Sequence, residues 1–259
     1  DSYIFLTGMA IYPFIFSKYN PKKILISAGH LNKDQIKYWK KWYLKGLGEY
    51  FYKNNLKHEI NLEIIPNSPK FKTDNLELEN KVLLLNGGGK DSCVSSEILK
   101  KSKIDFEWFT IGFSKSQKGV QSVSSCQVSN IILSYQKFYI PNTYKIYHGH
   151  KPFTLYTSSV AVLVAVLKRF KYVFLSNEKS SNFGNLKINN IEINHQWTKS
   201  LEFEKMYSNY LKIYVNPNIS YSSILKPLYE IQIAKIFSNF PKYHNYFISC
   251  NRLGTKEWC

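Results

Sequence analysis

Three consecutive glycines separate an apolar run from a lysine, an aspartate and a serine. The stretch reads Leu83-Leu84-Leu85-Asn86-Gly87-Gly88-Gly89-Lys90-Asp91-Ser92. Glycines let backbone N–H groups approach an anion closely, and a helix that begins after them adds partial positive charge. An ordinary strand-to-helix turn is the alternative, but such a turn rarely needs three glycines. We therefore predict a phosphate-binding turn, in which Asp91 binds Mg²⁺ or orients the loop, formed by Gly87, Gly88, Gly89, Lys90, Asp91 and Ser92.

Polar side chains also follow two later apolar segments. The first polar run is residues 148–154, with His148 and His150, and the second is residues 176–182. Residues just past the carboxyl ends of parallel strands line the ligand crevice of an open sheet. A polar turn that caps a helix, or a solvated loop, is the alternative for each run. We expect four of these residues at the same mouth as the glycine turn, namely His150, Asn177, Glu178 and Asn182.

A third polar segment, residues 192–204, leads into a predicted helix. Ser200 is expected to cap this helix, and Glu202 and Glu204 suit the positive end of its dipole, so both glutamates have a purely structural alternative. In a chain with a phosphate turn, we favour a segment that faces the substrate. His195 is then a candidate general acid or base with a pKa suited to neutral pH, Lys199 contacts an anion, and Glu202 binds substrate.

Residues before about 76 are predicted to form a small α/β portion. The apolar segment 3–16 is interpreted as a buried helix or strand, because a span across a bilayer needs about 20 residues. Helical spacing of apolar residues predicts a helix over 32–52, and short apolar runs predict strands at 22–27 and 60–65. The proline-containing stretch 66–75 is interpreted as a linker, so we place domains at 1–75 and 76–259.

From residue 81 onward, short apolar strands alternate with helices. This order predicts parallel pairing with crossover helices, and hence an open, mainly parallel α/β sheet with helices on both faces. A helical part is expected after residue 186. The predicted strands are 81–85, 106–113, 144–147 and 172–175, and the predicted helices are 92–101, 123–138, 153–170, 200–211 and 222–240.

The chain has 259 residues, of which 44% are hydrophobic, so it can form a core and is neither a small disulfide scaffold nor a disordered protein. Lys and Arg number 35 against 18 Asp and Glu, a formal charge of +17. This balance favours anionic partners, although codon drift in an AT-rich genome is an equally weighted alternative. Four scattered cysteines fit a reducing, cytoplasmic setting. The chain opens on Asp1, and we treat it as a possible fragment.

The glycine turn lacks the spacing of a Walker A motif and of the dinucleotide fingerprint. It resembles the PP-loop of the ATP pyrophosphatase family, Ser-Gly-Gly-x-Asp-Ser, with Gly87 in place of the first serine. The resemblance implies a PP-loop (HUP-like) fold and an ATP cleaved between its α and β phosphates with Mg²⁺. It also implies one missing hydroxyl contact to phosphate at Gly87, which a backbone N–H can replace.

Over residues 82–259 the chain resembles the bacterial UDP-N-acetylmuramoyl-L-alanyl-L-glutamate epimerases. The resemblance is carried by the glycine turn and the three polar segments in this order, together with the closing Ser249-Cys250-Asn251-Arg252 and Trp258-Cys259. The resemblance implies an ATP- and Mg²⁺-dependent isomerase of peptidoglycan synthesis that adenylates the terminal glutamate carboxylate and inverts its α-carbon. Its partner is an anionic, nucleotide-linked small molecule. In this setting Glu178 is a Mg²⁺ ligand or a base, His195 a base or acid, and His150 approaches the adenylate. The family continues into further cysteines, whereas Cys250 and Cys259 alone cannot complete a four-ligand zinc site.

Two other functions remain open at this point. A PP-loop enzyme that adenylates a tRNA base would use the positive charge and the aromatic residues for backbone neutralisation and stacking. Against it stand the lack of an appended RNA-binding module and of a paired Cys-x-x-Cys. The other is a degenerate PP-loop protein that serves as a scaffold subunit, and absence of ATP binding would favour it.

Overall fold

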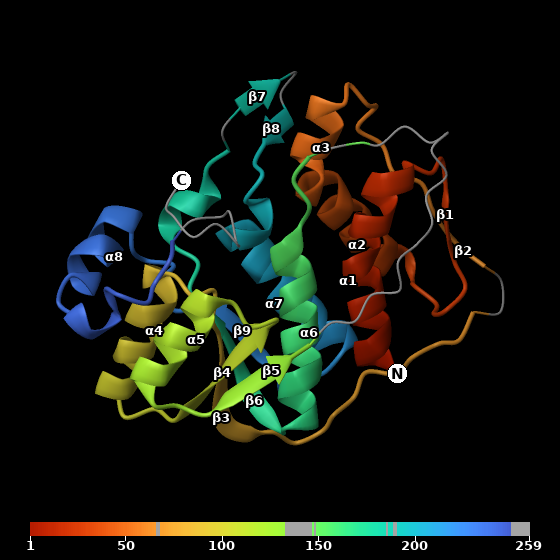
Figure 1. The fold of residues 1–259 in the computed structure, drawn as a ribbon. Helices are drawn as coiled ribbons and strands as arrows, with labels where there is room; N and C mark the ends of the chain where they lie inside the picture. Colours follow the sequence, from red (N-terminus) through yellow and green to blue (C-terminus); the bar gives the residue numbers. More distant parts are fainter. Residues whose placement is uncertain (66–67, 133–146, 148, 185, 189–190, 250–259) are drawn as a thin grey trace. The chain divides into compact units, whose positions relative to one another are not determined.

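The computed structural model describes residues 1–65, 68–132, 147, 149–184, 186–188 and 191–249 (Figure 1). The chain forms two compact units. Unit 1 comprises Asp1–Leu76, Lys137–Leu163 and Ser181–Asn218, and unit 2 comprises Glu77–Gln136, Val164–Ser180 and Ile219–Cys259. Helix α6 (Phe153–Leu167) passes from one unit into the other. The predicted domain division at residues 75 and 76 stays a prediction, and the units themselves are assembled from several chain segments.

Unit 2 is built on a five-stranded sheet in the order β5-β4-β3-β6-β9, and every strand pair is parallel. Its central strand β3 begins with exposed polar residues and continues into Val82, Leu83 and Leu84, which are buried on both pleat faces, as is typical of a parallel strand covered on both sides. This sheet confirms the predicted open parallel α/β fold. The strands are β3 (Glu79–Leu85), β4 (Phe106–Ile111), β5 (Val128–Ile131), β6 (Phe170–Leu175) and β9 (Ser220–Ser223).

Helices α4 (Lys90–Lys101), α5 (Lys115–Ser124) and α8 (Glu230–Phe237) flank this sheet. They share one hydrophobic cluster with the strands, to which Leu84, Val94 and Trp108 belong, each with no exposed surface. Leu84 lies opposite Trp108 on β4 and opposite Phe174 on β6. The carboxyl ends of β3 and β6 therefore lie side by side, at the edge of the sheet where the glycine turn begins.

Two predicted elements of unit 2 are wrong. The helix expected over 123–138 is instead α5, which ends at Ser124, followed by strand β5. Ser114 and Gln117 form a capping box that starts α5 early, and Ser125 ends it with a φ of 55°. The helix expected over 222–240 is shorter, because residues 220–223 pair with β6 as β9. Residues 133–138 and 144–146 lie outside the described part of the chain.

Unit 1 is mainly helical and packs around aromatic side chains. Its helices are α1 (Ser2–Tyr19), α2 (Lys33–Gly46), α3 (Gly48–Lys53) and α7 (Leu201–Tyr214), together with the first part of α6. Trp39, Trp42 and Tyr207 have no exposed surface, and Trp39 Nε1 donates to Tyr210 Oη at 3.0 Å. These contacts join α2 to α7, so unit 1 depends on side chains that lie far apart in the sequence.

Small sheets complete unit 1. Strands β1 (Ile24–Ile26) and β2 (Leu62–Ile64) pair in parallel, and β7 (Leu186–Ile188) pairs with β8 (Ile191–Ile193) in an antiparallel hairpin. The predicted strands near 24 and 62, the helix α1 and the capped helix α7 are confirmed. The helix expected over 32–52 is interrupted at Leu47, and the β7–β8 hairpin was not predicted. None of the described helices combines the length and the apolar character of a membrane span.

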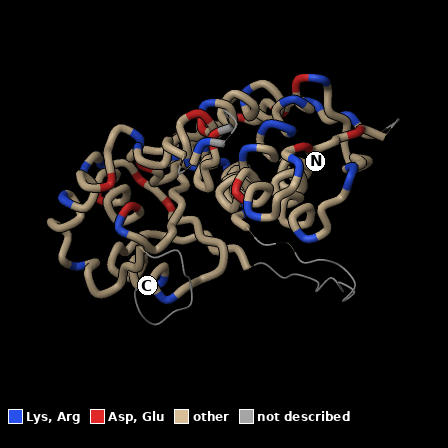
Figure 2. Tube along the Cα trace, turned by 90° about the horizontal axis from the view of Figure 1, so that it is seen from above, with Lys and Arg blue, Asp and Glu red and all other residues tan. Residues whose placement is uncertain are grey.

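Figure 2 shows basic and acidic residues scattered along the described trace, and the whole sequence has 35 Lys and Arg against 18 Asp and Glu. They occur on helices, strands and loops. The charge balance therefore does not by itself identify a binding face, and the candidate site has to be argued from individual contacts.

Candidate functional site

The glycine turn joins β3 to α4 in unit 2, and its shape depends on one glycine above all. Gly88 has a φ of +76°, and a Cβ there would lie 2.4 Å from Ser116 Oγ. The side chains of the turn hold its backbone as well. Asn86 Oδ1 accepts from the Gly88 N–H at 2.8 Å, and Ser92 Oγ accepts from the Gly87 N–H at 3.0 Å. The turn is thus a built loop at the start of a 12-residue helix.

Lys90 is the cation of this turn, and its side chain is only 13% exposed. Its Nζ lies 3.0 Å from Asp91 Oδ1 and 3.0 Å from Glu230 Oε1. Burial lowers the pKa of Lys90, but the two carboxylates outweigh it, and the net pKa is raised. Lys90 therefore carries its charge at neutral pH and is partly neutralised by Glu230, a residue that the sequence did not single out.

Asp91 is the predicted Mg²⁺ ligand. Burial raises its pKa, Lys90 opposes this, and the carboxylates of Glu230 and Glu178 raise it further. Asp91 Oδ1 is buried. It forms an ion pair with Lys90 Nζ, but the geometry of this contact is not that of a hydrogen bond. In the described ranges no three His, Cys, Asp or Glu side chains converge as a metal site. Mg²⁺ often takes only one or two carboxylates beside substrate phosphates, so the residues present fit that ion.

Asn177 and Glu178 follow β6, beside the glycine turn at the same edge of the sheet. Ser223 Oγ donates to the Asn177 carbonyl at 2.7 Å, and Lys226 Nζ donates to the Glu178 carbonyl at 3.0 Å. The Glu178 carboxylate accepts from the Ser180 N–H. Asn177 and Glu178 thus lie at the same sheet edge as the glycine turn within unit 2, and their predicted roles in binding stay predictions.

His150 and His195 meet in unit 1. Their ring centroids lie 5.6 Å apart with an interplanar angle of 79°. Burial lowers the pKa of His150, and the charges of His195, Lys199 and Lys53 lower it further, while Glu49 opposes them. His150 is therefore neutral at pH 7 and can accept a proton.

The backbone before His150 lies directly on helix α3. Gly149 has a φ of +151°, and a Cβ there would come within 2.7 Å of Tyr50 Cα. Only glycine permits this approach, which holds His150 near the carboxylate of Glu49. Glu49 belongs to α3 and pairs with Lys53 one turn later. The sequence signal for these charged neighbours of His150 was the i,i+4 spacing of Glu49 and Lys53.

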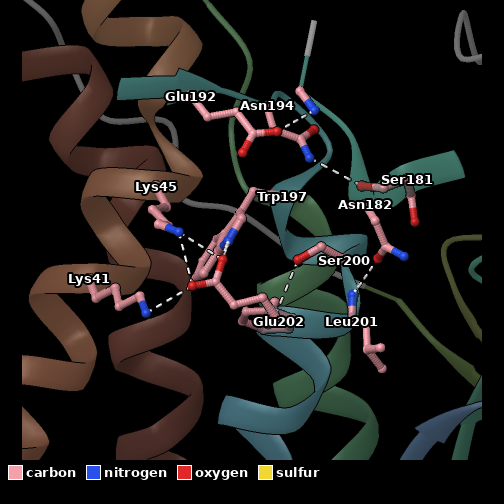
Figure 3. Close-up of polar contacts among 12 residues, drawn as sticks. Lys41, Lys45, Ser181, Asn182, Glu192, Asn194, Trp197, Ser200, Leu201 and Glu202 are labelled. Atoms are coloured by element: carbon pink, nitrogen blue, oxygen red, sulfur yellow. Dashed lines mark hydrogen bonds and ion pairs between the residues drawn. The ribbon is translucent and has the colours of Figure 1, made fainter. Parts of the chain in front are cut away.

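The remaining predicted residues of unit 1 surround the start of α7 (Figure 3). Ser200 caps α7 by accepting from the Phe203 N–H at 3.2 Å, and Asn182 Oδ1 accepts from the Leu201 N–H at 2.7 Å. The Lys199 carbonyl accepts from Ser181 Oγ at 3.0 Å. Asn182 and the backbone of Lys199 thus organise the entry into α7, and their predicted contacts with substrate stay predictions.

Glu202 is the centre of a polar cluster at the same helix start (Figure 3). Its carboxylate lies 2.8 Å from Lys41 Nζ and 2.7 Å from Lys45 Nζ, and it accepts from Trp197 Nε1 at 2.7 Å. Burial would raise the pKa of Glu202, but these three donors outweigh it and lower the pKa to about 2. These contacts match the structural alternative for Glu202, while its role in substrate binding remains a prediction.

The predicted site residues therefore fall into two groups. Unit 2 holds the glycine turn with Asn177 and Glu178, and unit 1 holds His150, Asn182, His195, Lys199 and Glu202. That both groups share one mouth stays a prediction. His148, Cys250, Asn251, Arg252, Trp258 and Cys259 lie outside the described residues.

Comparison with known proteins matches a family model described as the MurL N-terminal domain to residues 14–224. A curated protein from Xanthomonas oryzae pv. oryzae named UDP-N-acetyl-alpha-D-muramoyl-L-alanyl-L-glutamate epimerase is 32% identical over 249 residues, which cover 92% of this chain and 55% of that protein. A protein of the same name from a Micromonospora species is 35% identical over 233 residues, or 84% of this chain and 50% of that protein. The chain spans about half the length of these relatives.

Solved structures are less similar. The U34-tRNA thiolase NcsA from Methanococcus maripaludis aligns with 71% of this chain and 62% of its own, at a TM-score of 0.43 and 10% sequence identity. A likeness at this level supports no inference about function.

Proposed function

The chain belongs to the MurL N-terminal domain family, and from this premise we propose that it acts in the ATP-dependent epimerisation of UDP-N-acetylmuramoyl-L-alanyl-L-glutamate. The observation that carries the proposal is the 32% identity to a named epimerase across 92% of the chain. The product would be the D-glutamyl epimer, a precursor of peptidoglycan. The substrate carries a diphosphate and carboxylates, which suits a chain with a formal charge of +17.

The glycine turn supports the ATP part of the proposal. The N-terminus of α4 lies at the edge of the parallel sheet, where ligands of open α/β folds bind, and the positive end of the helix dipole suits a phosphate. Lys90 adds a charged side chain that is held in place by Asp91 and Glu230. Asp91 would hold Mg²⁺, which supplies charge neutralisation of the phosphates when bound.

The proposed chemistry begins at the terminal glutamate of the substrate. An α-carboxylate oxygen attacks the α-phosphorus of ATP, the bond to the bridging oxygen of the β-phosphate breaks, and pyrophosphate leaves. A free carboxylate resists loss of the neighbouring Cα proton because a dianionic enolate would form. The acyl adenylate lacks that extra charge, so a base can take the proton. Protonation from the other face and hydrolysis release AMP and the D-glutamyl product.

The base is proposed to come from the histidine pair of unit 1. His150 is held neutral by burial and by its cationic neighbours, and His195 lies against it at 5.6 Å. Such a pair can accept a proton near neutral pH and return one. Lys199 would contact an anionic group of the substrate, and Glu178 would bind Mg²⁺ or serve as a second base.

Chiral analysis of glutamate tests the proposal. The chain is incubated with Mg²⁺-ATP and the L-glutamyl substrate, the product is hydrolysed in acid, and D-glutamate is measured together with AMP and pyrophosphate. We expect D-glutamate only when ATP is present, and loss of it in Lys90→Ala and Asp91→Ala. Lys235→Ala on α8 is the matched control. All-L glutamate from a folded chain that binds ATP would refute the proposal.

The two alternative functions stay predictions. A salt-dependent mobility shift with tRNA would favour base modification, and absence of ATP binding would favour a scaffold.

A further inference from the structure

Residues 241–249, which we call the strap, run along unit 2 after α8. Tyr243 is buried and donates its hydroxyl to Glu97 Oε1 on α4 at 2.6 Å. The ring of Phe247 packs on Phe237 of α8 with centroids 4.6 Å apart. The strap is therefore anchored on two helices before it reaches the glycine turn.

The end of the strap bonds directly to the glycine turn. The Ile248 N–H donates to the Gly88 carbonyl at 2.9 Å, and Ser249 Oγ accepts from the Lys90 N–H at 3.0 Å. A Cβ at Gly89 would lie 3.1 Å from Ser249 Oγ, closer than ordinary contact. The third glycine of the turn therefore leaves room for the strap, a reason that the sequence alone did not suggest.

The orientation of Ser249 leaves its own proton available. A hydroxyl that accepts from an N–H has one hydrogen to donate, and no described residue accepts it. The residue is exposed. In the same turn Gly87 is open, since among the described residues a Cβ there would meet only Ser92 Oγ, at 3.8 Å. The described residues therefore leave space at the first glycine of the turn and an exposed hydroxyl at the end of the strap.

We propose that Ser249 is a binding residue of the ATP site, carried to the glycine turn by the strap, where its hydroxyl donates to a phosphate oxygen. This inference rests on the proposed function. The Lys90 N–H polarises the hydroxyl, which strengthens it as a donor, and a bond to a charged oxygen is stronger than a neutral one. Ser249 thereby supplies a side-chain hydroxyl at a turn whose first position, Gly87, has none.

The opposite role would be occlusion, in which Ser249 occupies the place of a phosphate oxygen at the Lys90 N–H. The two roles predict opposite effects of removing the hydroxyl. The exposure of Ser249 favours the donating role, because an exposed hydroxyl whose proton no described residue accepts can donate to a phosphate oxygen.

Calorimetric titration with Mg²⁺-ATP tests the inference. We expect Ser249→Ala to weaken binding roughly tenfold to a hundredfold, the range for a hydrogen bond to a charged group, and Ser249→Thr to retain most of the affinity. Ser238→Ala is the matched control, because its hydroxyl donates to the Lys235 carbonyl at the end of α8, away from the glycine turn in the sequence. Equal melting temperatures of the variants would exclude loss of folding, and hydrogen exchange of the strap should slow when ATP binds.

Unchanged or tighter binding in Ser249→Ala would overturn the inference while leaving the ATP site intact. Failure of the wild-type chain to bind Mg²⁺-ATP would instead refute the ATP part of the proposed function, and the inference with it. Adenosine, which lacks phosphate, should bind the wild type and Ser249→Ala equally. A loss with adenosine would show that Ser249 acts through the fold and not through phosphate.

Discussion

Replacing Gly88 by alanine gives the sharpest test of the glycine turn. The residue has a φ of +76°, and its Cβ would lie 2.4 Å from Ser116 Oγ and 3.0 Å from the Gln117 backbone nitrogen. The left-handed backbone costs an alanine about 1–2 kcal/mol, and the crowding costs about 1–3 kcal/mol. We expect unit 2 to lose about 2–5 kcal/mol in free energy of unfolding, or roughly 5–15 °C in melting temperature.

Gly87→Ala is the matched control, because Gly87 has no positive φ and, within the part of the chain that the structure describes, its Cβ would meet only Ser92 Oγ at 3.8 Å. Its melting temperature should stay close to wild type. The double variant Gly88→Ala/Ser116→Gly should recover part of the crowding term, while the backbone term persists. Thermal unfolding followed by circular dichroism measures all three. A Gly88→Ala variant as stable as Gly87→Ala would refute the reasoning.

Three further predictions concern charged groups. Lys90→Ala should weaken Mg²⁺-ATP binding about a hundredfold in calorimetry, since a charge-assisted contact is lost, and unchanged affinity would remove Lys90 from the site. Glu202 has a pKa lowered to about 2, so its contribution is present above the unfolded pKa near 4.5 and is lost as the pH falls through 2. Glu202→Gln should therefore lower the free energy of unfolding by about 1 kcal/mol at pH 7, a figure discounted for the 42% exposure of Glu202. In urea unfolding curves, the difference in stability between wild type and variant should shrink below pH 4.5. Lys53→Met should raise the pKa of His150, because it removes a nearby cation and releases Glu49 from its ion pair. NMR titration of labelled histidines measures this pKa, and an unchanged midpoint would contradict the prediction.

Local signals account for the elements that were predicted well. The apolar run 82–84 is buried on both pleat faces, and the three glycines that follow Asn86 mark the start of α4, so both elements followed from residue type alone. The Ser114–Gln117 capping box was also a local signal, and it would have placed α5 correctly. By contrast, β9 is Ser-Tyr-Ser-Ser, without an apolar run, and it becomes a strand because β6 provides its hydrogen-bond partners.

In the candidate site, too, some residues could be recognised from the sequence, whereas their partners were found only in the structure. Glycines followed by Lys-Asp-Ser are recognisable from their chemistry, and so are His150 and His195 as titratable groups. The partners that decide their state are distant in sequence. Glu230 lies 140 positions from Lys90, and Ser249 lies 159 positions from it. No periodicity or spacing reports such a pair.

The sequence by itself determined the glycine turn between β3 and α4, the alternation of strands and helices, and the family, because these depend on residue types in short, ordered motifs. Only the tertiary structure decided which carboxylate pairs with Lys90, which hydroxyl reaches the turn, and that Glu202 is engaged by Lys41, Lys45 and Trp197. The reason is physical. Hydrogen bonds and ion pairs act over a few ångströms, and chain folding alone determines which distant side chains come within that range.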